Sequence, residues 1–578
     1  MTDAAAKVEA AKKALADAEA ALAAEAAAAV RPSVRADPGT GPLDAAAIEF
    51  IRAGYAFEGE VLEMGALVNG DALPNVQVRI PVAMLNRHGL VAGATGTGKT
   101  RTLQLLAEQL SAAGVPVFAA DIKGDLSGIA SPGEASAKLL ERTTGIGQNW
   151  SPASSPVEYY TLGGQGTGIP IRATVSSFGP LLLSKVLGLN STQESSLGLV
   201  FHYADGAGLP LVGLDDLRAV LLWLASDEGK PELKSLGGLG GATVGVILRK
   251  LITFADQGAD VFFGEPEIDT ALFLRQAADG RGIVSLLEIP GVQDKPALFS
   301  TFLMWMLADL FNDLPEVGDI DKPKLVFFFD EAHLLFADAS KEFIDSITQT
   351  VRLIRSKGVG IVFVTQTPKD VPNDVLAQIG SRVQHQLRAH TPDDARALRS
   401  TVSTFPTSDY DLGEVLTTLA TGEAIITVMN ERGAPTPVAW TRLRAPQGSM
   451  APTAADAMLA TVKASPLLAT YGAILDRESA YEILSAKMNA AAESKAAAEA
   501  AKAQTAEEKK LAAQYEQEWR DAASRSAPSR TPPRTSPRTS TRTPRKEPNV
   551  IADALGSRTG QTVVREVLRG IFSTLKRR

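Results

Sequence analysis

The sequence of 578 residues has no cysteine, only five histidines and no long uninterrupted apolar stretch. Without cysteine the chain forms no disulfide or thiolate metal site and has no cysteine nucleophile. The histidines are too scattered to predict a metal cluster. Residues 1–30 lack the apolar core of a signal peptide, and the longest apolar run, Phe299–Leu310, is too short to span a bilayer. These absences predict a cytoplasmic protein without stable membrane insertion.

The composition is ordinary for a globular protein, with 45% hydrophobic and 21% charged residues. The formal net charge of −8 gives no overall attraction to nucleic acid or to anionic membranes. Binding to either would therefore require a local basic patch. The length predicts roughly two to four domains.

Changes in composition divide the chain. An Ala-rich helix is expected over residues 1–30 and a linker over 31–45, before a globular domain over 46–454. A helical extension follows over 455–520. Residues 521–547 are rich in Arg, Pro, Ser and Thr without apolar anchors, which predicts a disordered basic linker. Residues 548–578 are expected to end in an amphipathic helix.

Apolar strand-like segments alternate with helical patterns in the globular domain, which predicts an α/β fold with a mostly parallel sheet. The expected strands are Val115–Ala120, Leu325–Phe329, Gly360–Val364 and, more weakly, Val383–Leu387. The segment between the first two is too long for one crossover. We therefore expect a helical insertion at about 174–280.

The strongest motif fits the pattern G-x-x-x-x-G-K-[ST] and lies between a strand-like segment, His88–Ala92, and a helical one, Thr102–Ala112. Its glycines let consecutive N–H groups point at phosphate oxygens, and the helix presents its positive end to the same anion. Lys99 is expected to bridge the β- and γ-phosphates and Thr100 to bind Mg²⁺. The nucleotide-binding residues are predicted to be Gly93, Ala94, Thr95, Gly96, Thr97, Gly98, Lys99, Thr100 and Arg101.

A second motif is an apolar strand that ends in two carboxylates, Asp330 and Glu331. The aspartate is expected to hold Mg²⁺, and the glutamate to orient and deprotonate the attacking water. The alternative is a solvated strand end with no catalytic role. His333 is expected to pack in a helix. We expect the phosphate loop and this acid pair to face each other across neighbouring strands.

Three further residues are candidates for catalysis. Gln366 ends another apolar strand and is a candidate sensor of the γ-phosphate, with an inert loop glutamine as the alternative. Arg355 and Arg382 are candidates to neutralise transition-state charge, one of them across a subunit boundary; a structural role is left open for each. Asp121 and Asp125 follow the expected strand Val115–Ala120. Their carboxylates could contact the water shell of magnesium or orient a neighbouring loop, or they could only cap the turn.

Together these motifs resemble the HerA/FtsK superfamily of P-loop motor ATPases, most of all the bacterial HerA-like proteins. The resemblance rests on the phosphate loop and on Asp121–Leu126, Leu187–Gln193, Phe329–Phe336, Arg355–Gly360, Thr365–Pro368, Thr421–Ile426 and Leu568–Ile571. It implies a RecA-like core, ring-shaped homo-oligomers that are often hexameric, and ATP sites at subunit junctions. Only residues 46–92 precede the phosphate loop in the globular part, which is less than the N-terminal β-barrel of better-known HerA translocases. A nuclease partner is therefore not implied.

The sequence leaves more than one function open. The first is an ATP-hydrolysing motor that translocates DNA, contacting it through the ring pore and through the basic tail Ser524–Lys546, which has seven Lys/Arg and no acid. The second is an ATP-driven switch or remodelling scaffold that acts on protein partners. A third is a membrane-associated ATPase that binds anionic lipid through its last helix.

Overall fold

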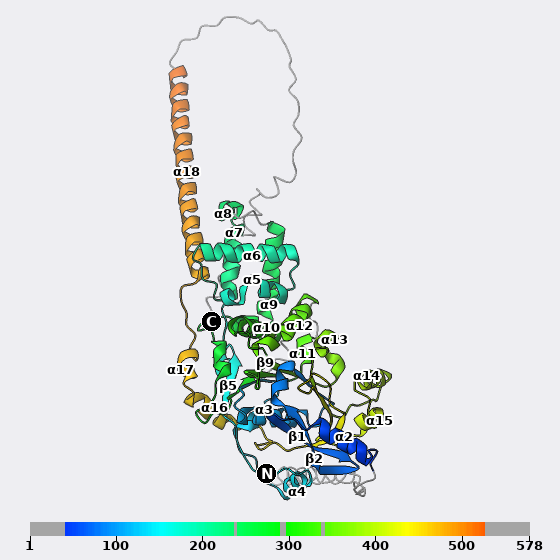
Figure 1. Ribbon diagram of the computed structural model, residues 1–578. Helices are drawn as coiled ribbons and strands as arrows, with labels where there is room; N and C mark the ends of the chain where they lie inside the picture. Colours follow the sequence, from blue (N-terminus) through cyan, green and yellow to red (C-terminus); the bar gives the residue numbers. More distant parts are fainter. Residues whose placement is uncertain (1–40, 236–239, 290–295, 319, 337–340, 526–578) are drawn as a thin grey trace, which may run out of the picture. The chain divides into compact units, whose positions relative to one another are not determined.

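The computed structural model describes residues 41–235, 240–289, 296–318, 320–336 and 341–525 (Figure 1). The helices and linkers expected over 1–40 and 526–578 therefore lie outside the described residues. The chain divides into two compact units, residues 1–494 and 495–578. Everything below on the sheet and the site concerns the first unit. In the second, the described residues form the last part of one helix, α18 (Ala480–Arg525).

Twelve strands of the described residues form one sheet, in the order β2-β1-β12-β11-β10-β3-β9-β8-β4-β7-β5-β6. The pairs from β10 through β3 to β6 are parallel, and those from β2 to β10 are antiparallel. The predicted α/β class with a mostly parallel sheet is thus confirmed. The strands are β1 (Val61–Asn69), β2 (Asp71–Pro81), β3 (Gly89–Ala92), β4 (Val117–Asp121), β5 (Val157–Leu162), β6 (Ile169–Ile171), β7 (Val284–Glu288), β8 (Leu325–Phe329), β9 (Val359–Thr365), β10 (Ser381–Gln384), β11 (Glu423–Val428) and β12 (Ala439–Leu443).

The central strands are continuously apolar because helices cover both faces of the sheet. Every residue of β3, β4, β8 and β9 is buried. Phe118 of β4 and Phe327 of β8 are register partners whose ring centroids lie 5.4 Å apart. Phe302 of α10 (Pro296–Asp313) packs on Phe118 at 6.1 Å, so α10 covers this face.

Connection direction explains which helix covers which face. Helix α3 (Lys99–Ala112) connects β3 to β4, and this crossover passes β9 and β8 in the sheet. The later crossovers run in the opposite direction: α10 connects β7 to β8, and α12 (Lys341–Ile354) connects β8 to β9. Right-handed crossovers in opposite directions place their helices on opposite faces of a parallel sheet. Figure 1 accordingly draws α3 on the opposite side of the sheet from α10 and α12.

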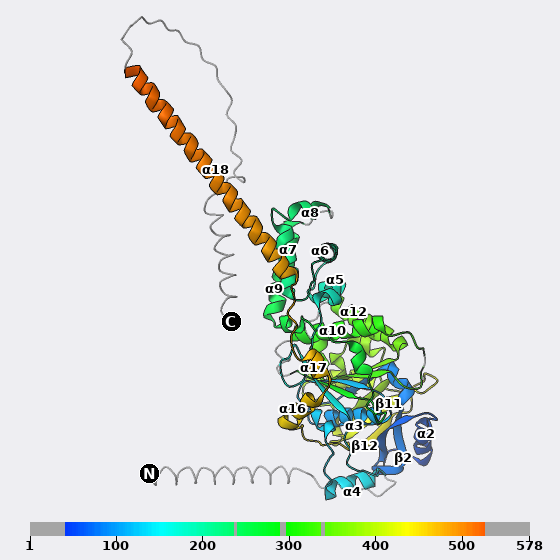
Figure 2. The same ribbon diagram turned by 90° about the vertical axis from the view of Figure 1, so that its left-hand side faces the viewer.

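In the segment expected to be a helical insertion, the described residues form the α-helices α5 to α9, which gather beyond α10 in both views (Figures 1 and 2). They are α5 (Val175–Val186), α6 (Ser191–Gly206), α7 (Leu214–Ala225), α8 (Lys230–Ser235) and α9 (Gly241–Asp256). The phrase Leu187–Gln193 enters α6 here. Asn190 accepts a hydrogen bond from the Gln193 amide at 3.0 Å and Gln193 returns one at 3.1 Å, a reciprocal cap that fixes the start of the helix.

The boundary expected at residue 454 differs from the division of the structure, which lies at 494. The reason is that α16 (Ala455–Ala464) packs on β5 and α17 (Leu467–Tyr471) packs on β6. Arg172, beside β6, also donates a hydrogen bond to the carbonyl of Tyr471 at 3.0 Å. These helices cover the sheet edge and thus belong to the first unit.

The remaining helices surround the sheet. They are α2 (Ala45–Gly54), α4 (Ala137–Gly145), α11 (His333–Phe336), α13 (Asn373–Leu376), α14 (Pro392–Val402) and α15 (Leu412–Thr418). None of the helices in the described ranges combines the length and apolar character needed to cross a bilayer. The cytoplasmic location stays a prediction.

Candidate functional site

The phosphate loop connects β3 to α3 and is held at both ends by backbone hydrogen bonds. The amide of Gly93 donates to Thr365 of β9 at 3.2 Å, and that of Ala94 donates to Gln386, beyond β10, at 2.8 Å. Gly98 precedes α3 with φ at 109°, a conformation that favours glycine. The loop is therefore anchored to the strands on both sides of β3, and its shape depends on glycine at the helix entrance.

His385 forms the floor of this loop. Its ring is fully buried, and a Cβ added at Gly93 would lie 2.4 Å from the His385 Cβ. Burial, with the Lys99 charge, lowers the pKa of His385 to about 4, so the ring is neutral at physiological pH. Glycine is thus required at position 93 because the backbone packs closely against His385, a residue far along the chain.

Lys99 lies inside the loop and donates hydrogen bonds to the carbonyls of Gly93 at 2.7 Å and Ala94 at 3.2 Å. Burial lowers its pKa, while the carboxylates of Glu331 and Asp330 act in the opposite direction. The ammonium therefore lies close to both acids of the second motif.

The acid pair follows β8 at the same edge of the sheet. Burial and the neighbouring Glu331 charge raise the pKa of Asp330 to about 6. Burial would also raise the pKa of Glu331, but its hydrogen bond and ion pair with Lys123 outweigh this, helped by His333 and Gln366, so that pKa is lowered. The two adjacent carboxyl groups thus differ in proton affinity, and Glu331 is the more strongly ionised.

A cavity of about 510 Å³ brings the two motifs together. Its lining combines two lysines with three carboxylates and the threonine hydroxyl at the start of α3. It is lined by Thr95, Gly96, Gly98, Lys99, Thr100, Arg101, Lys123, Asp125, Asp330, Glu331 and Thr421. Lys123 and Thr421 were not singled out as site residues from the sequence, although Lys123 lies within the Asp121–Leu126 phrase and Thr421 opens the Thr421–Ile426 phrase of the family resemblance.

The expected placement of the two motifs on neighbouring strands is wrong. The phosphate loop follows β3 and the acids follow β8, but β9 lies between these strands and pairs with both. The apolar patterns of β8 and β9 are alike, so the sequence could not show which of the two strands lies next to β3. The interposed strand ends at Thr365, which places the next residue, Gln366, between the loop and the acids.

Gln366 also borders a smaller cavity of about 180 Å³ with Ala94, Thr95 and Arg388. Arg388 donates a hydrogen bond to the carbonyl of Thr95 at 3.3 Å. It lies beyond β10, where the sequence gave no reason to choose it over other arginines. The smaller cavity therefore adds a cation beside the phosphate loop.

Neither predicted arginine lines the 510 Å³ cavity. Arg355 precedes β9, whose seven residues separate it from the nucleotide edge by about 20 Å. Arg382 of β10 donates to the Thr404 hydroxyl at 2.6 Å and lies 5.0 Å from the centroid of the Phe405 ring. Arg355 therefore lies away from the cavity of its own chain, and the side chain of Arg382 is held by Thr404 and Phe405.

Asp121 caps the turn that follows β4. Its carboxylate accepts a hydrogen bond from the Leu126 amide at 2.8 Å, and burial raises its pKa. Asp125 lines the cavity instead. Of the two acids left open by the sequence, one thus shapes the turn and the other faces the site.

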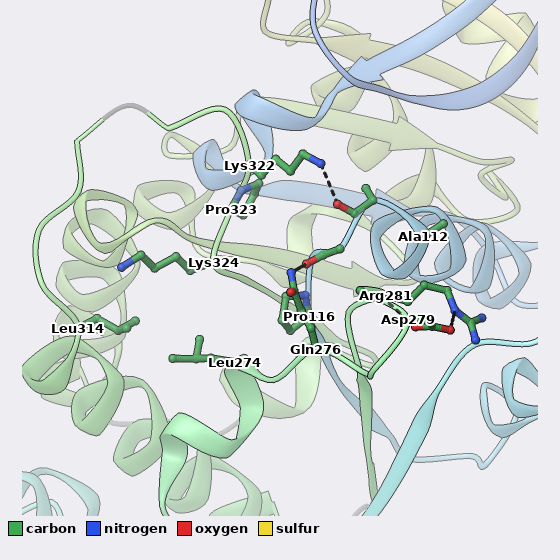
Figure 3. A pocket seen from close by; sticks show the side chains of 13 residues that line it. Ala112, Pro116, Leu274, Gln276, Asp279, Arg281, Leu314, Lys322, Pro323 and Lys324 are labelled. Carbon is green, nitrogen blue, oxygen red and sulfur yellow. Dashed lines mark hydrogen bonds and ion pairs between the residues drawn. The ribbon is translucent and has the colours of Figure 1, made fainter.

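A larger cavity of about 610 Å³ lies at the opposite edge, near the amino ends of β4 and β8 (Figure 3). Four of its polar side chains already have partners: Arg281 pairs with Asp279, Gln276 donates to Gly114 at 2.6 Å, and Lys322 donates to Ala113 at 2.9 Å. It lacks the combination of a phosphate loop and acid pair, so size alone does not mark the site.

Comparison with known families agrees with this geometry. Residues 67–578 match the model of the family described as helicase HerA-like C-terminal. The chain belongs to this family. The HerA-like resemblance is thereby confirmed, and the RecA-like core with it. Together with the cavity, membership identifies an enzyme that hydrolyses nucleoside triphosphates.

Two curated relatives of this HerA-like chain are named DNA double-strand break repair helicase HerA. The one from Sulfurisphaera tokodaii is 23% identical over 377 residues, 64% of this chain and 67% of that protein. The one from Saccharolobus solfataricus is 22% identical over 392 residues, 67% of this chain and 69% of that protein.

Solved structures similar to the chain include a bacterial conjugative coupling protein, TrwB, and VirB4 of Thermoanaerobacter pseudethanolicus. TrwB has a TM-score of 0.48 at 14% identity, covering 71% of this chain and 94% of that one. VirB4 has a TM-score of 0.43 at 14% identity, covering 67% and 97%.

Proposed function

We propose that this HerA-like chain is an ATP-driven motor that acts on DNA as a ring of identical subunits. The observation that carries the proposal is the cavity that combines Lys99 and Thr100 with Asp330 and Glu331. Such a combination binds a triphosphate and activates water in one place. A binding protein without hydrolysis has no need of the second acid.

ATP and Mg²⁺ are the expected ligands of the cavity. The hydroxyl of Thr100 and the carboxylate of Asp330 line it together and are the hard oxygen ligands that Mg²⁺ prefers. Bound there, the ion would neutralise phosphate charge. The raised pKa of Asp330 fits a carboxyl group that is fully ionised only when a cation accompanies it.

Hydrolysis follows from the position of Glu331. Its carboxylate takes a proton from water as the water oxygen attacks the γ-phosphorus, and the bond from that phosphorus to the bridging oxygen breaks. Lys99 neutralises the developing negative charge. Gln366 lies between the phosphate loop and the acids and contributes to the low pKa of Glu331, which supports a role as sensor.

A ring would let Arg355 or Arg382 act at the site of a neighbouring subunit. Lys99, Arg101 and Lys123 of the same chain line the cavity, whereas Arg355 lies at the opposite edge of its own sheet, so it can add to the stabilisation of the transferring phosphoryl charge only from another copy. In a ring, the Arg355 or Arg382 of one subunit can face the cavity of the next. This supports assembly of several copies, six in the simplest reading of the family resemblance.

DNA is the proposed substrate because both curated relatives are named DNA repair helicases. A second support is the basic stretch 524–546, whose seven Lys/Arg and lack of acids suit sequence-independent contact with phosphates. DNA would pass through the ring pore while this stretch adds salt-sensitive affinity.

The test is the rate of ATP hydrolysis by the purified chain with and without double-stranded or single-stranded DNA. We expect DNA to raise kcat about tenfold at low salt and less at high salt. A matched variant replaces the seven Lys/Arg of residues 524–546 by Gln. It should keep basal hydrolysis but lose most of the salt-dependent DNA affinity. Hydrolysis that no DNA stimulates would contradict the proposal.

The second candidate is an ATP-driven switch or scaffold acting on protein partners. It is favoured by the helical insertion α5–α9, which exposes the apolar side chains of Leu181, Leu222 and Ile252. Under this function, DNA would leave kcat unchanged. Replacing these three residues by Ser would then weaken partner binding without altering basal hydrolysis.

A further inference from the structure

Lys123 and Glu331 form an ion pair across two neighbouring strands, within the cavity described above. The Glu331 side chain is 6% exposed, whereas that of Lys123 is 42% exposed. Lys123 thus reaches from a more open position into the site, and its ammonium contacts one oxygen of the proposed catalytic base.

The turn after β4 holds Lys123 in this position. The Asp121 carboxylate accepts the Leu126 amide at 2.8 Å, and the Ser127 hydroxyl donates to the Gly124 carbonyl at 2.7 Å. Gly124 has φ at 73°, a conformation that favours glycine. The turn is thus closed by its own hydrogen bonds, and these place the backbone of Lys123 beside the acid pair.

Glu331 is oriented from its own side as well. Its φ is 50°, which is rare and strained for a residue other than glycine. The Asp330 carboxylate accepts the Glu331 amide at 2.9 Å, and His333 Nδ1 lies 3.3 Å from Glu331 Oε2. Such strain in a functional site is usually retained because it aims a side chain. Here it aims the carboxylate at Lys123.

An ion-paired carboxylate is a poor base because the adjacent ammonium, here on Oε1 of Glu331, stabilises the ionised form of the whole carboxylate and lowers its affinity for a proton. The same ammonium faces a cavity built for a strongly anionic triphosphate, together with Lys99 and Thr100. Glu331 and the γ-phosphate therefore compete for Lys123.

We propose that Lys123 is a switch: it holds Glu331 until a γ-phosphate draws its ammonium away and leaves the carboxylate to accept the proton of water. ADP lacks the γ-phosphate and leaves the Lys123–Glu331 pair intact. Lys123 is thus a positioning residue that couples base release to the triphosphate state. This inference rests on the proposed hydrolysis at this site.

The first test uses binding, with the full-length chain, ADP and the slowly hydrolysed analogue ATPγS. In Glu331→Gln the anion that competes for Lys123 is gone, so ATPγS should bind about 5- to 10-fold tighter while ADP affinity stays the same. Adding Lys123→Met should remove this gain. An unchanged ratio of ATPγS to ADP affinity in Glu331→Gln would overturn the proposal.

The second test separates the switch from a purely structural ion pair. Lys123→Met keeps the apolar stem and should lose about tenfold of the preference for ATPγS over ADP and at least about tenfold in kcat. Lys123→Arg should restore most of the preference. If Lys123→Met instead hydrolyses ATP faster than wild type, Lys123 only restrains the base and the proposal fails.

A matched control is Lys322→Met, which removes an ion pair with Glu60 from a lysine of similar exposure, 46%, at the opposite edge of the sheet. It should leave both affinities and kcat unchanged. Should Lys123→Met not fold, the Glu331→Gln single variant still decides the question. A wild-type chain that hydrolyses no ATP would refute the proposed function, whereas normal wild-type hydrolysis with an unaltered Lys123→Met would refute the switch alone.

Discussion

Thr102 and His385 meet beneath the phosphate loop, where the Thr102 Oγ1 and the His385 Nε2 lie 2.9 Å apart in a buried contact. Thr102 belongs to the first turn of α3, and His385 follows β10. The contact therefore fixes the start of the helix that presents its positive end to the phosphates. The loop depends on this support as well as on its own glycines.

Thr102→Val removes the hydroxyl and leaves the buried His385 nitrogen unsatisfied, at a cost of about 1–3 kcal/mol. Because the loop loses its floor contact, we expect nucleotide affinity to fall about 5- to 10-fold, measured by titration with a fluorescent ATP analogue. Thr441→Val is the control, since the Thr441 hydroxyl donates only to Ala439 of its own strand. Equal affinities in the two variants would show that the contact is dispensable.

Lys99→Ala and Glu331→Gln should separate binding from chemistry. The first removes the phosphate-binding ammonium and should abolish measurable nucleotide binding. The second keeps binding but should lower kcat by about 10²- to 10⁴-fold, because no base accepts the proton of water. Single-turnover hydrolysis and equilibrium binding distinguish the two effects.

The control for Glu331→Gln is Glu158→Gln. Glu158 is also a buried, ion-paired glutamate, 2.7 Å from Arg275, but it lies near the amino end of β5. Its replacement should affect stability and not the chemical step. Unaltered turnover in Glu331→Gln would remove Glu331 as the base.

Arg355 lies at the edge of the sheet opposite its own cavity, so any catalytic role requires a neighbouring subunit. Arg355→Ala should lower kcat at least about tenfold while the nucleotide affinity of the chain changes little. Mixing inactive Lys99→Ala chains with Arg355→Ala chains should restore part of the activity, since some mixed junctions contain both intact groups.

Arg382→Ala serves as the comparison in the mixing experiment. Because Arg382 contacts Thr404 and Phe405, we expect a loss of stability and no complementation. Complementation by Arg382→Ala chains instead would assign the arginine in trans to that residue.

His88 makes stability depend on pH. Its Nε2 donates to the Val351 carbonyl at 2.7 Å and its Nδ1 accepts the Ile361 amide at 3.1 Å, so protonation breaks the second bond. Burial lowers the pKa of His88 from 6.5 to about 4. The stabilisation by neutral His88 is complete above pH 6.5 and is lost as the pH falls toward 4. By pH 5 the free energy of unfolding has decreased by about 2 kcal/mol.

Denaturant unfolding at pH 8 and pH 5 measures this loss. His88→Gln can keep both hydrogen bonds without titrating, so its stability should fall less than that of wild type over the same range. His385 shifts in the same direction and remains in both proteins. A wild type and variant with the same pH dependence would contradict the assignment.

The sequence by itself determined the phosphate loop and the acid pair, because each is a contiguous motif whose residues set their own backbone and chemistry. Gly98 at φ 109° and the apolar run Leu325–Phe329 are local consequences of their residues. The alternation of strands and helices likewise followed from local periodicity.

Tertiary structure alone decided what these motifs face. Strand order placed β9 between β3 and β8, and brought Lys123 to Glu331 across 208 positions of sequence. It also put Arg355 at the edge of the sheet opposite the cavity, although the sequence had made this arginine a candidate to neutralise transition-state charge. Such pairings depend on which distant strands become neighbours, and a local pattern of apolar and polar residues fits several strand orders equally well.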